Sequence, residues 1–267
     1  MYEETTFIPC ERGQLPPGPW LVFAPHPDDE TFGLGGSLLL AREAGIAAHV
    51  VVVTDGAAGG SGTDLVERRE AETRAVGEAL GLASLTFWRQ PDRGGPLPAA
   101  LMDELHRLLR GFRSSTHPTS QAPASVFFPS PFEPNPDHRA CAAFVWDGLV
   151  SYGYRGQAFS YEISVQGPVD RLIDITAVAA RKRELMAMYL SQLDQNAYVE
   201  RLDALNRSRS WSLPMDATHA EGLCRWPDLR GRLADRLRER LSRYWQPDAL
   251  PGTVPQAWWQ RLFGGSG

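Results

Sequence analysis

Short apolar runs alternate with longer amphipathic segments in the first half of the chain. The apolar runs predict buried strands at Trp20–Ala24, Ala48–Thr54, Leu85–Trp88 and Val126–Pro129. The segments between them predict helices at Thr31–Ala44, Asp64–Leu80 and Leu97–Phe112. Strands separated by helices of this length indicate βαβ units, so we expect an α/β protein with a mostly parallel sheet flanked by helices.

The pattern changes after the fourth strand. A helix is predicted at Ala140–Val150, followed by two strands, Phe159–Val165 and Arg171–Ile175, which we expect to be antiparallel. A helix at Ala177–Leu190 and a mostly helical, arginine-rich stretch to Tyr244 follow. The tail, Pro247–Gly267, is either a packed arm or a loosely held end.

Composition narrows the class of protein. The 267 residues are 43% hydrophobic and 22% charged, as in an ordinary globular protein, and the formal net charge of -5 argues against a general affinity for nucleic acid. No apolar run approaches the ~20 residues that span a bilayer, so we expect no transmembrane segment. No secretory signal is visible, and the three cysteines are far apart, so we expect a cytoplasmic enzyme without disulfides or a thiolate zinc site.

The most informative segment directly follows the first predicted strand. It reads Ala24-Pro25-His26-Pro27-Asp28-Asp29-Glu30 and places one imidazole and three carboxylates on one turn. In open α/β sheets, ligands bind outside the carboxyl ends of the strands. His26 and Asp29 are separated by two residues, so both could face one metal ion on a tight turn.

A second polar segment follows another predicted strand and ends in Asn135-Pro136-Asp137-His138. A catalytic zinc takes three protein ligands and keeps one position for water, so His138 is the best candidate for the third ligand. Two histidines and a carboxylate suit Zn²⁺, with another divalent metal such as Fe²⁺ or Co²⁺ as the alternative. Asp28 is then available as a general base, and this combination favours amide or ester hydrolysis.

Simpler interpretations compete with this site. Asp28 or Asp29 could instead accept hydrogen bonds from the first amides of the following helix. Gly33-Leu34-Gly35-Gly36 lacks the spacing of a dinucleotide-binding loop, so we expect close packing of the helix on the sheet there.

At these residues the chain resembles the PIG-L/LmbE family of zinc-dependent N-deacetylases, which act on N-acetylglucosamine-containing compounds. The resemblance spans roughly residues 20–225 and continues through weaker matches. These are Gly35-Gly36, Thr54-Asp55-Gly56, Arg69 with Glu72, Leu80-Gly81, Pro136-Asp137-His138-Arg139, Lys182, Tyr189 with Ser191-Gln192, Leu205-Asn206-Arg207 and Ala220-Glu221. It implies a Rossmann-like fold over a single domain, residues 1–267, with a helical extension from about residue 226.

The family's roles transfer to matching positions. The resemblance implies that His26, Asp29 and His138 bind zinc and that Asp28 is the general base. One departure is Asn135, where the family has a histidine assigned as proton donor or as a stabiliser of the tetrahedral intermediate. An amide cannot give up a proton at neutral pH. We expect Asp28 to act as both base and acid and Asn135 to orient the acetyl oxygen; His219 could be the donor instead, or the reaction could be slower or different.

Other candidate residues each have two interpretations. Arg69 contacts substrate or is a surface helix charge, Asp55 contacts substrate or caps a loop, and His219 reaches the active site or does not. Asp137 orients a ligand from behind or caps the helix after it. The aromatic residues Trp88, Phe132 and Trp211 could stack on a sugar, although each could equally belong to the core. The loops 56–63, 89–98 and 113–124 could shape the cleft.

Three functions remain open at this point. The leading hypothesis is a hydrolase that removes the N-acetyl group from an N-acetylglucosamine-type sugar or glycoconjugate. A zinc-dependent hydratase or lyase on the same scaffold is the second, and a metal-binding module without catalysis is the third. The sequence identifies neither the acetylated substrate nor the oligomeric state, and an oligomer is possible.

Overall fold

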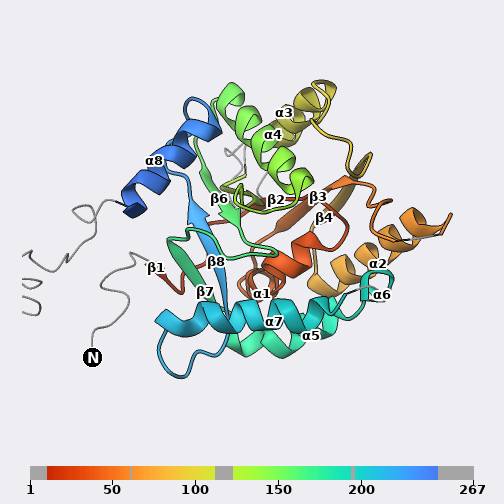
Figure 1. Cartoon of the computed structure of the whole chain (residues 1–267), viewed down its shortest axis with the longest axis vertical. Helices are drawn as coiled ribbons and strands as arrows, with labels where there is room; N and C mark the ends of the chain where they lie inside the picture. Colours follow the sequence, from red (N-terminus) through yellow and green to blue (C-terminus); the bar gives the residue numbers. More distant parts are fainter. Residues whose placement is uncertain (1–10, 61, 112–122, 194–195, 246–267) are drawn as a thin grey trace, which may run out of the picture.

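The structure is a computed structural model that describes residues 11–60, 62–111, 123–193 and 196–245. One eight-stranded sheet runs through it in the order β1-β7-β8-β6-β5-β2-β3-β4 (Figure 1). The strands are β1 (Glu11–Arg12), β2 (Trp20–Ala24), β3 (Ala48–Thr54), β4 (Ser84–Gln90), β5 (Ser125–Pro129), β6 (Gln157–Tyr161), β7 (Arg171–Asp174) and β8 (Ala220–Arg225).

Helices cover both faces of the sheet. They are α1 (Asp29–Glu43), α2 (Leu65–Leu80), α3 (Ala100–Gly111), α4 (Pro136–Tyr152), α5 (Ala179–Met186), α6 (Leu190–Leu193), α7 (Tyr198–Arg209) and α8 (Leu233–Trp245). Helices α1, α2, α5, α6 and α7 lie on one face, and α3, α4 and α8 lie on the other (Figure 1). The prediction of a mostly parallel sheet flanked by helices is therefore confirmed.

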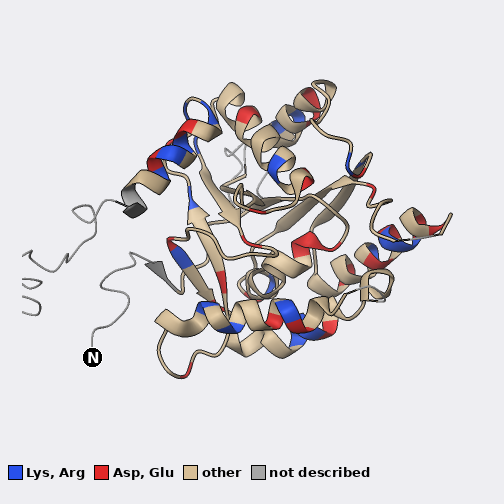
Figure 2. Ribbon diagram, in the orientation of Figure 1, with Lys and Arg blue, Asp and Glu red and all other residues tan. Residues whose placement is uncertain are grey.

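Side chains along β2 point alternately to the two faces of the sheet, which explains why two cores form. Trp20, Val22 and Ala24 pack into the core under α1, whereas Leu21 and Phe23 pack into the core under α4. All five residues are fully buried, because successive side chains of a central strand point to opposite, helix-covered faces. Charged residues are concentrated on the outer helices, and the N-terminal turn of α1 forms an acidic segment near the centre (Figure 2).

The last part of the sheet differs from the prediction. The two strands β6 and β7 do not pair with each other, because β8 lies between them and is antiparallel to both. The sequence of β8, Ala-Glu-Gly-Leu-Cys-Arg, has no β-branched residue and carries a buried glutamate, so its pattern did not indicate a strand. The expected helical stretch to Tyr244 is thus interrupted by a strand, and the tail from residue 246 lies outside the described residues.

Helix α1 is almost completely buried and packs very closely. A Cβ at Gly33 would lie 2.5 Å from Tyr161, and one at Gly36 would lie 2.6 Å from Ile175. These glycines therefore serve close packing of the helix on the sheet, as expected from their spacing.

A buried ion pair forms hydrogen bonds with backbone groups near the midpoint of α1. Lys182 donates to the carbonyl of Phe32 (2.9 Å) and pairs with Glu221 (2.8 Å). Glu221 in turn accepts the backbone amides of Gly36 (2.7 Å) and Ser37 (2.8 Å). In an α-helix the Gly36 amide donates to the Phe32 carbonyl, so the ion pair contacts both partners of one bond of the helical ladder.

Candidate metal centre and catalytic site

The sheet order brings the two predicted motifs together. From β2 the chain adds β3 and β4 on one side, and it then crosses to the other side of β2 to form β5. The strands β2 and β5 are parallel neighbours, so the loops that follow them leave the same edge of the sheet where the strand order reverses. This is where open α/β sheets place their ligand sites.

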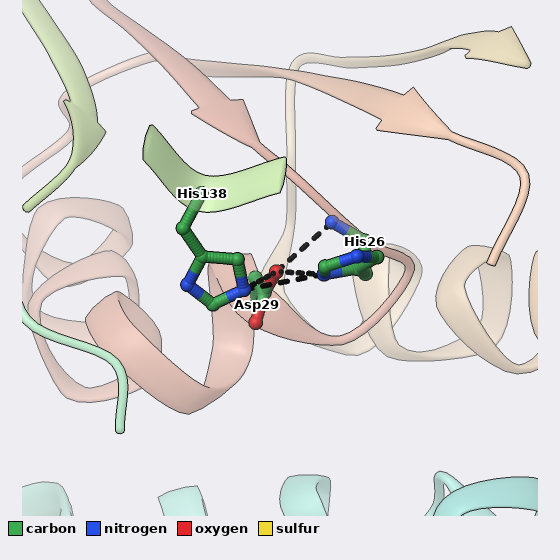
Figure 3. A group of neighbouring side chains, drawn as sticks. All are labelled: His26, Asp29 and His138. Atoms are coloured by element: carbon green, nitrogen blue, oxygen red, sulfur yellow. Dashed lines mark hydrogen bonds and ion pairs between the residues drawn. The ribbon is translucent and has the colours of Figure 1, made fainter. Parts of the chain in front are cut away.

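Three donor atoms converge at this point (Figure 3). His26 Nδ1 lies 3.0 Å from Asp29 Oδ2, His138 Nε2 lies 3.2 Å from the same oxygen, and the two ring nitrogens are 3.2 Å apart. All three side chains are buried, and they form a group that could hold a metal ion. Two imidazole nitrogens and one carboxylate oxygen suit a divalent metal of the zinc type. The predicted approach of His26 and His138 is therefore confirmed.

The turn that carries His26 and Asp29 is tightly constrained. Asp29 Oδ2 accepts the backbone amide of His26 at 2.9 Å, which closes the turn. Asp28 has a φ of 152°, a conformation that L residues rarely adopt and that costs roughly 1–3 kcal/mol. The carboxylate of Asp28 makes no capping hydrogen bond to α1, so the capping interpretation is wrong for this residue.

Asp28 instead forms a buried ion pair with Arg69 of α2. Arg69 Nη2 donates to Asp28 Oδ2 at 3.0 Å, and the same guanidinium donates to the carbonyls of Gly56 (2.7 Å) and Pro27 (3.2 Å). Arg69 is only 2% exposed, so its interpretation as a surface charge is wrong. A Cβ at Gly56 or Gly59 would lie within 2.5 Å of the guanidinium, which explains why glycines occupy this loop.

Burial and neighbouring charges tune the two adjacent carboxyl groups in opposite directions. Burial raises the pKa of Asp28 to about 7; Arg69 opposes this rise and the nearby Asp29 adds to it. Burial would also raise the pKa of Asp29, but His138 and His26 outweigh it and hold that pKa far below its usual range. Asp29 is therefore a permanent anion, whereas Asp28 can exchange a proton near neutral pH.

The pKa values of the two histidines are shifted as well. Burial lowers the pKa of His138, but Asp29 and Glu133 outweigh burial and raise it to about 9. The pKa of His26 is also raised, because Asp137, Asp29 and Asp92 outweigh burial. A bound cation requires neutral imidazoles, so metal binding would release protons from these two residues.

A carboxylate lies behind each histidine. His26 Nε2 is 3.5 Å from Asp92 Oδ1 and 3.6 Å from Asp137 Oδ2, and His138 Nδ1 is 3.5 Å from Glu133 Oε2. Such partners fix the orientation of metal-binding imidazoles. Sequence reasoning missed Asp92 and Glu133, although Asp92 follows β4 at the same edge of the sheet and Glu133 follows β5.

Asn135, and not Asp137, caps the N-terminus of α4. Asn135 is the N-cap of α4, and its Oδ1 accepts the amide of Asp137 at 2.9 Å. The capping interpretation of Asp137 is therefore wrong; its carboxylate faces His26 and accepts the backbone amide of Arg93 at 3.2 Å. Because Oδ1 of Asn135 is engaged, the Nδ2 group is the part of this side chain that is left to donate.

A cavity of about 250 Å³ opens over the donor atoms. His26, Asp28, Asp29, Asn135 and His138 contribute to its lining, and so does Arg69. The loops 56–63 and 89–98 contribute Ala58, Gly59, Asp92 and Arg93, as expected, whereas most of 113–124 lies outside the described residues.

The aromatic lining of the cavity differs from the prediction. Phe32 and Tyr198 line it, and the sequence candidates Trp88, Phe132 and Trp211 do not. Trp88 packs against Phe23 in the core, while Trp211 is 80% exposed.

Two other candidates lie outside this lining. Asp55 Oδ1 accepts the backbone amides of Ala57 (3.0 Å) and Asp92 (3.1 Å), which supports its interpretation as a loop cap. His219 contacts Thr218 and lies 3.3 Å from Asp203 on α7, and neither it nor Asp203 lines the cavity.

The fold and the site define an α/β protein with a candidate metal centre at the edge of a mostly parallel sheet. Comparison with known families finds a match to the segment that carries this site. Residues 21–149 match the PIG-L family, described as GlcNAc-PI de-N-acetylase, so this segment is a domain of that family. The matched segment contains both loops of the candidate site.

Individual relatives extend this comparison. The chain is 30% identical over 140 residues to a diacetylchitobiose deacetylase of Thermococcus kodakarensis, a match that covers 49% of each protein, so it spans about half the length of that relative. The solved structure of N,N'-diacetylchitobiose deacetylase from Pyrococcus horikoshii is similar with a TM-score of 0.66, 20% identity and coverage of 78% and 83% of the two chains.

A solved structure of a hydratase shares the same fold. GalB from Pseudomonas putida, a 4-carboxy-2-hydroxymuconate hydratase, is similar with a TM-score of 0.65, 20% identity and coverage of 84% and 99%. At such identities the likeness shows the fold alone, so function must be argued from the site. In the described part of the chain, no helix is long and apolar enough to cross a membrane.

Proposed function

We propose that this protein is a zinc-dependent N-deacetylase that hydrolyses the N-acetyl group of an N-acetylglucosamine-type sugar or glycoconjugate. The observation that carries the proposal is the convergence of His26, Asp29 and His138 beside a separate carboxylate, Asp28, in one cavity. A metal site alone requires only the first three residues. The fourth adds an acid–base group that is not needed to hold the ion.

His26 Nδ1, Asp29 Oδ2 and His138 Nε2 would hold the metal. When bound, a divalent cation supplies a Lewis acid that makes water more acidic and polarises the amide carbonyl. Asp92, Asp137 and Glu133 hold the imidazoles in place from behind, at 3.5, 3.6 and 3.5 Å.

Asp28 moves the proton in this proposal. Its carboxylate accepts a proton from the attacking water as the oxygen adds to the acetyl carbon. It then passes that proton to the sugar nitrogen as the C–N bond breaks, which yields a free amine and acetate. A pKa of about 7 suits both steps, because the group gains and loses a proton readily near neutral pH.

Asn135 stabilises the reacting acetyl group in this proposal. Its Oδ1 accepts the Asp137 amide and the residue lines the cavity, so Nδ2 is the group that would hydrogen-bond the acetyl oxygen as charge develops on it. This role needs a donor and no proton transfer, which makes the missing histidine at this position tolerable.

The choice of substrate rests on the relatives and the cavity. The matched family and the Thermococcus relative are both described by removal of acetyl from a glucosamine-containing molecule. Phe32 and Tyr198 give the cavity an aromatic wall, and its volume of about 250 Å³ is below the ~300–1,000 Å³ of sites for drug-sized ligands. A single sugar ring therefore suits the inner part of the site.

A hydratase or lyase is the second candidate, favoured by the absence of a histidine at position 135 and by the fold shared with GalB. The two candidates predict different products: a hydratase adds water to a carbon–carbon double bond and releases no acetate. Asp28, buried beside the metal group with a pKa near neutral, favours hydrolysis.

The decisive experiment is a product assay on zinc-loaded protein. Acetate and primary amine would be measured with N-acetylglucosamine, N,N'-diacetylchitobiose and N-acetylglucosaminyl phosphatidylinositol. We expect equal amounts of both products from at least one substrate and none with the Asp28→Asn variant. A wild-type protein that binds zinc and releases no acetate from any of them would contradict the proposal and favour a non-catalytic metal module or a hydratase.

A further inference from the structure

Two arginines near the end of β4 adopt a conformation that arginine rarely occupies. Arg89 has a φ of 51° and Arg93 has a φ of 58°, both in the left-handed region where glycine is the usual residue. Such strain persists only where the surrounding structure holds it in place, and it is concentrated at functional sites. The two residues differ in what holds the strained backbone in place.

Arg89 is compensated by an ion pair. Its Nε and Nη2 donate to the two carboxylate oxygens of Glu70 at 2.5 and 2.9 Å, and the residue does not line the cavity. A bidentate pair of this kind is among the stronger polar contacts of a protein surface. The strain at Arg89 therefore has a structural explanation.

Arg93 has no such partner. It lines the cavity, and among the described residues its guanidinium makes one hydrogen bond, a long one of 3.5 Å to the carbonyl of Ala58. Its backbone amide is held by Asp137, which ties this residue to the group behind His26. Among the described residues, no carboxylate lies within ion-pair distance of its guanidinium.

The other arginine in the described cavity lining already has a carboxylate partner. Arg69 is paired with Asp28 and donates to two carbonyls, so its positive charge is already balanced by a carboxylate. Arg93 is thus the arginine of the described cavity lining that has no carboxylate partner and is available to bind a charged ligand.

We propose that Arg93 binds an anionic substituent, a phosphate or a carboxylate, carried by the sugar substrate. Arg93 is then a specificity-determining residue of the proposed deacetylase, on which this inference rests. A sugar whose acetamide reaches the metal group would direct an outer substituent toward the rim, where the guanidinium can form a bidentate contact.

The test compares charged and neutral substrates. Kinetics would be measured on N-acetylglucosamine 1-phosphate, N-acetylglucosamine 6-phosphate and N-acetylmuramic acid, with methyl N-acetylglucosaminide as the neutral reference. We expect kcat/KM for one anionic substrate to exceed that of the reference by about tenfold or more, mainly through a lower KM. A preferred phosphate or a preferred carboxylate identifies the source of the charge.

The Arg93→Gly variant separates binding from structure. Glycine relieves the left-handed backbone, so the melting temperature should not fall, while the ratio of anionic to neutral kcat/KM should drop to within about twofold of unity. Arg93→Lys keeps the charge and should retain part of the preference. Arg89→Gly is the matched control, since it changes an equally strained arginine outside the cavity, and it should leave the ratio unchanged.

Two failures can be told apart. If acetate is released but the wild-type ratio is near one, or if Arg93→Gly keeps the wild-type ratio, the inference about Arg93 is overturned while the deacetylase proposal stands. If no substrate releases acetate, the proposed function fails and the inference fails with it.

Discussion

Two buried ion pairs lie along helix α1: an outer pair, Asp28–Arg69, and an inner pair, Lys182–Glu221. They differ in how much of their hydrogen-bonding capacity is used. Asp28 and Arg69 pair at 3.0 Å at the N-terminal end of α1, where both line the cavity. Lys182 and Glu221 pair at 2.8 Å beside its midpoint, where both are 1% exposed. Each pair costs desolvation energy, which its hydrogen bonds must offset.

The inner pair has its hydrogen-bonding capacity filled. The three donors of Lys182 are matched by Glu221, the Phe32 carbonyl and Asn206, and Glu221 also accepts two amides of α1. The outer pair is incomplete: Arg69 Nε has no hydrogen-bond partner among the described residues, and the pKa of Asp28 is raised to about 7. A buried ion pair with unused bonding capacity therefore indicates a catalytic role, and one whose capacity is filled indicates a role in stability.

The largest expected effect is on the outer pair. Asp28→Asn keeps the shape of the side chain but removes the proton acceptor, so kcat should fall by about 10³-fold or more. Zinc content should stay near that of the wild type, because Asp28 is not among the donor atoms. Steady-state kinetics with metal analysis measures both, and a variant that retains a tenth of the activity would remove Asp28 from the proposed mechanism.

Substitutions in the inner pair, Lys182–Glu221, should lower the stability of the fold. Lys182→Met leaves Glu221 buried and unpaired, so the free energy of unfolding should fall by about 3–5 kcal/mol in urea denaturation. Adding Glu221→Gln should recover part of that loss, since the uncompensated charge is then gone. A double variant that loses the sum of both single losses would show that the two side chains do not act as a pair.

Arg69 should show its effect in the pH dependence. Its positive charge lowers the pKa of Asp28, so Arg69→Met should raise that pKa. Asp28 must be ionised to accept a proton, and the acid limb of the kcat/KM profile should therefore move to higher pH. We also expect kcat to fall by about 10–100-fold, the range seen when groups supporting a metal site are removed. An acid limb that stays in place would separate Arg69 from the reacting carboxylate.

Asn135 should give the smallest effect of this series. Asn135→Ala removes both the acetyl-oxygen donor and the N-cap of α4, so it should cost about 1 kcal/mol of stability and leave a measurable fraction of activity. Asn135→Ser is the matched control, because serine keeps the cap and lacks the amide donor. A loss in Asn135→Ala equal to that of Asp28→Asn would count against the assignment of both acid and base roles to Asp28.

Much of the central site could be predicted because its residues follow buried strands. His26, Asp29 and His138 each follow a strand with a clear apolar pattern, and parallel strands bring their carboxyl ends to one edge. The first six strands after residue 18, β2 to β7, are recognisable from their apolar residues for the same reason. Their boundaries shifted by only a few residues.

What the sequence could not provide were contacts between distant segments. Arg69 meets Asp28 across 41 residues, and Glu221 meets the amides of α1 across about 185, so neither partner is visible in a local pattern. The same limit hid β8, whose buried glutamate is acceptable only because Lys182 is opposite it. His219 was a plausible donor by residue type alone, and its place beside Asp203 depends on the packing of α7.

The most direct test of the account is the metal content of purified, zinc-loaded protein. The wild type should hold about one zinc ion per chain, and His138→Ala and Asp29→Ala should each reduce this to a small fraction. His106→Ala is the control, since His106 lies on α3 outside the donor group, and it should retain the ion. Full zinc occupancy in both His138→Ala and Asp29→Ala would contradict a metal centre shared by the loops after β2 and β5.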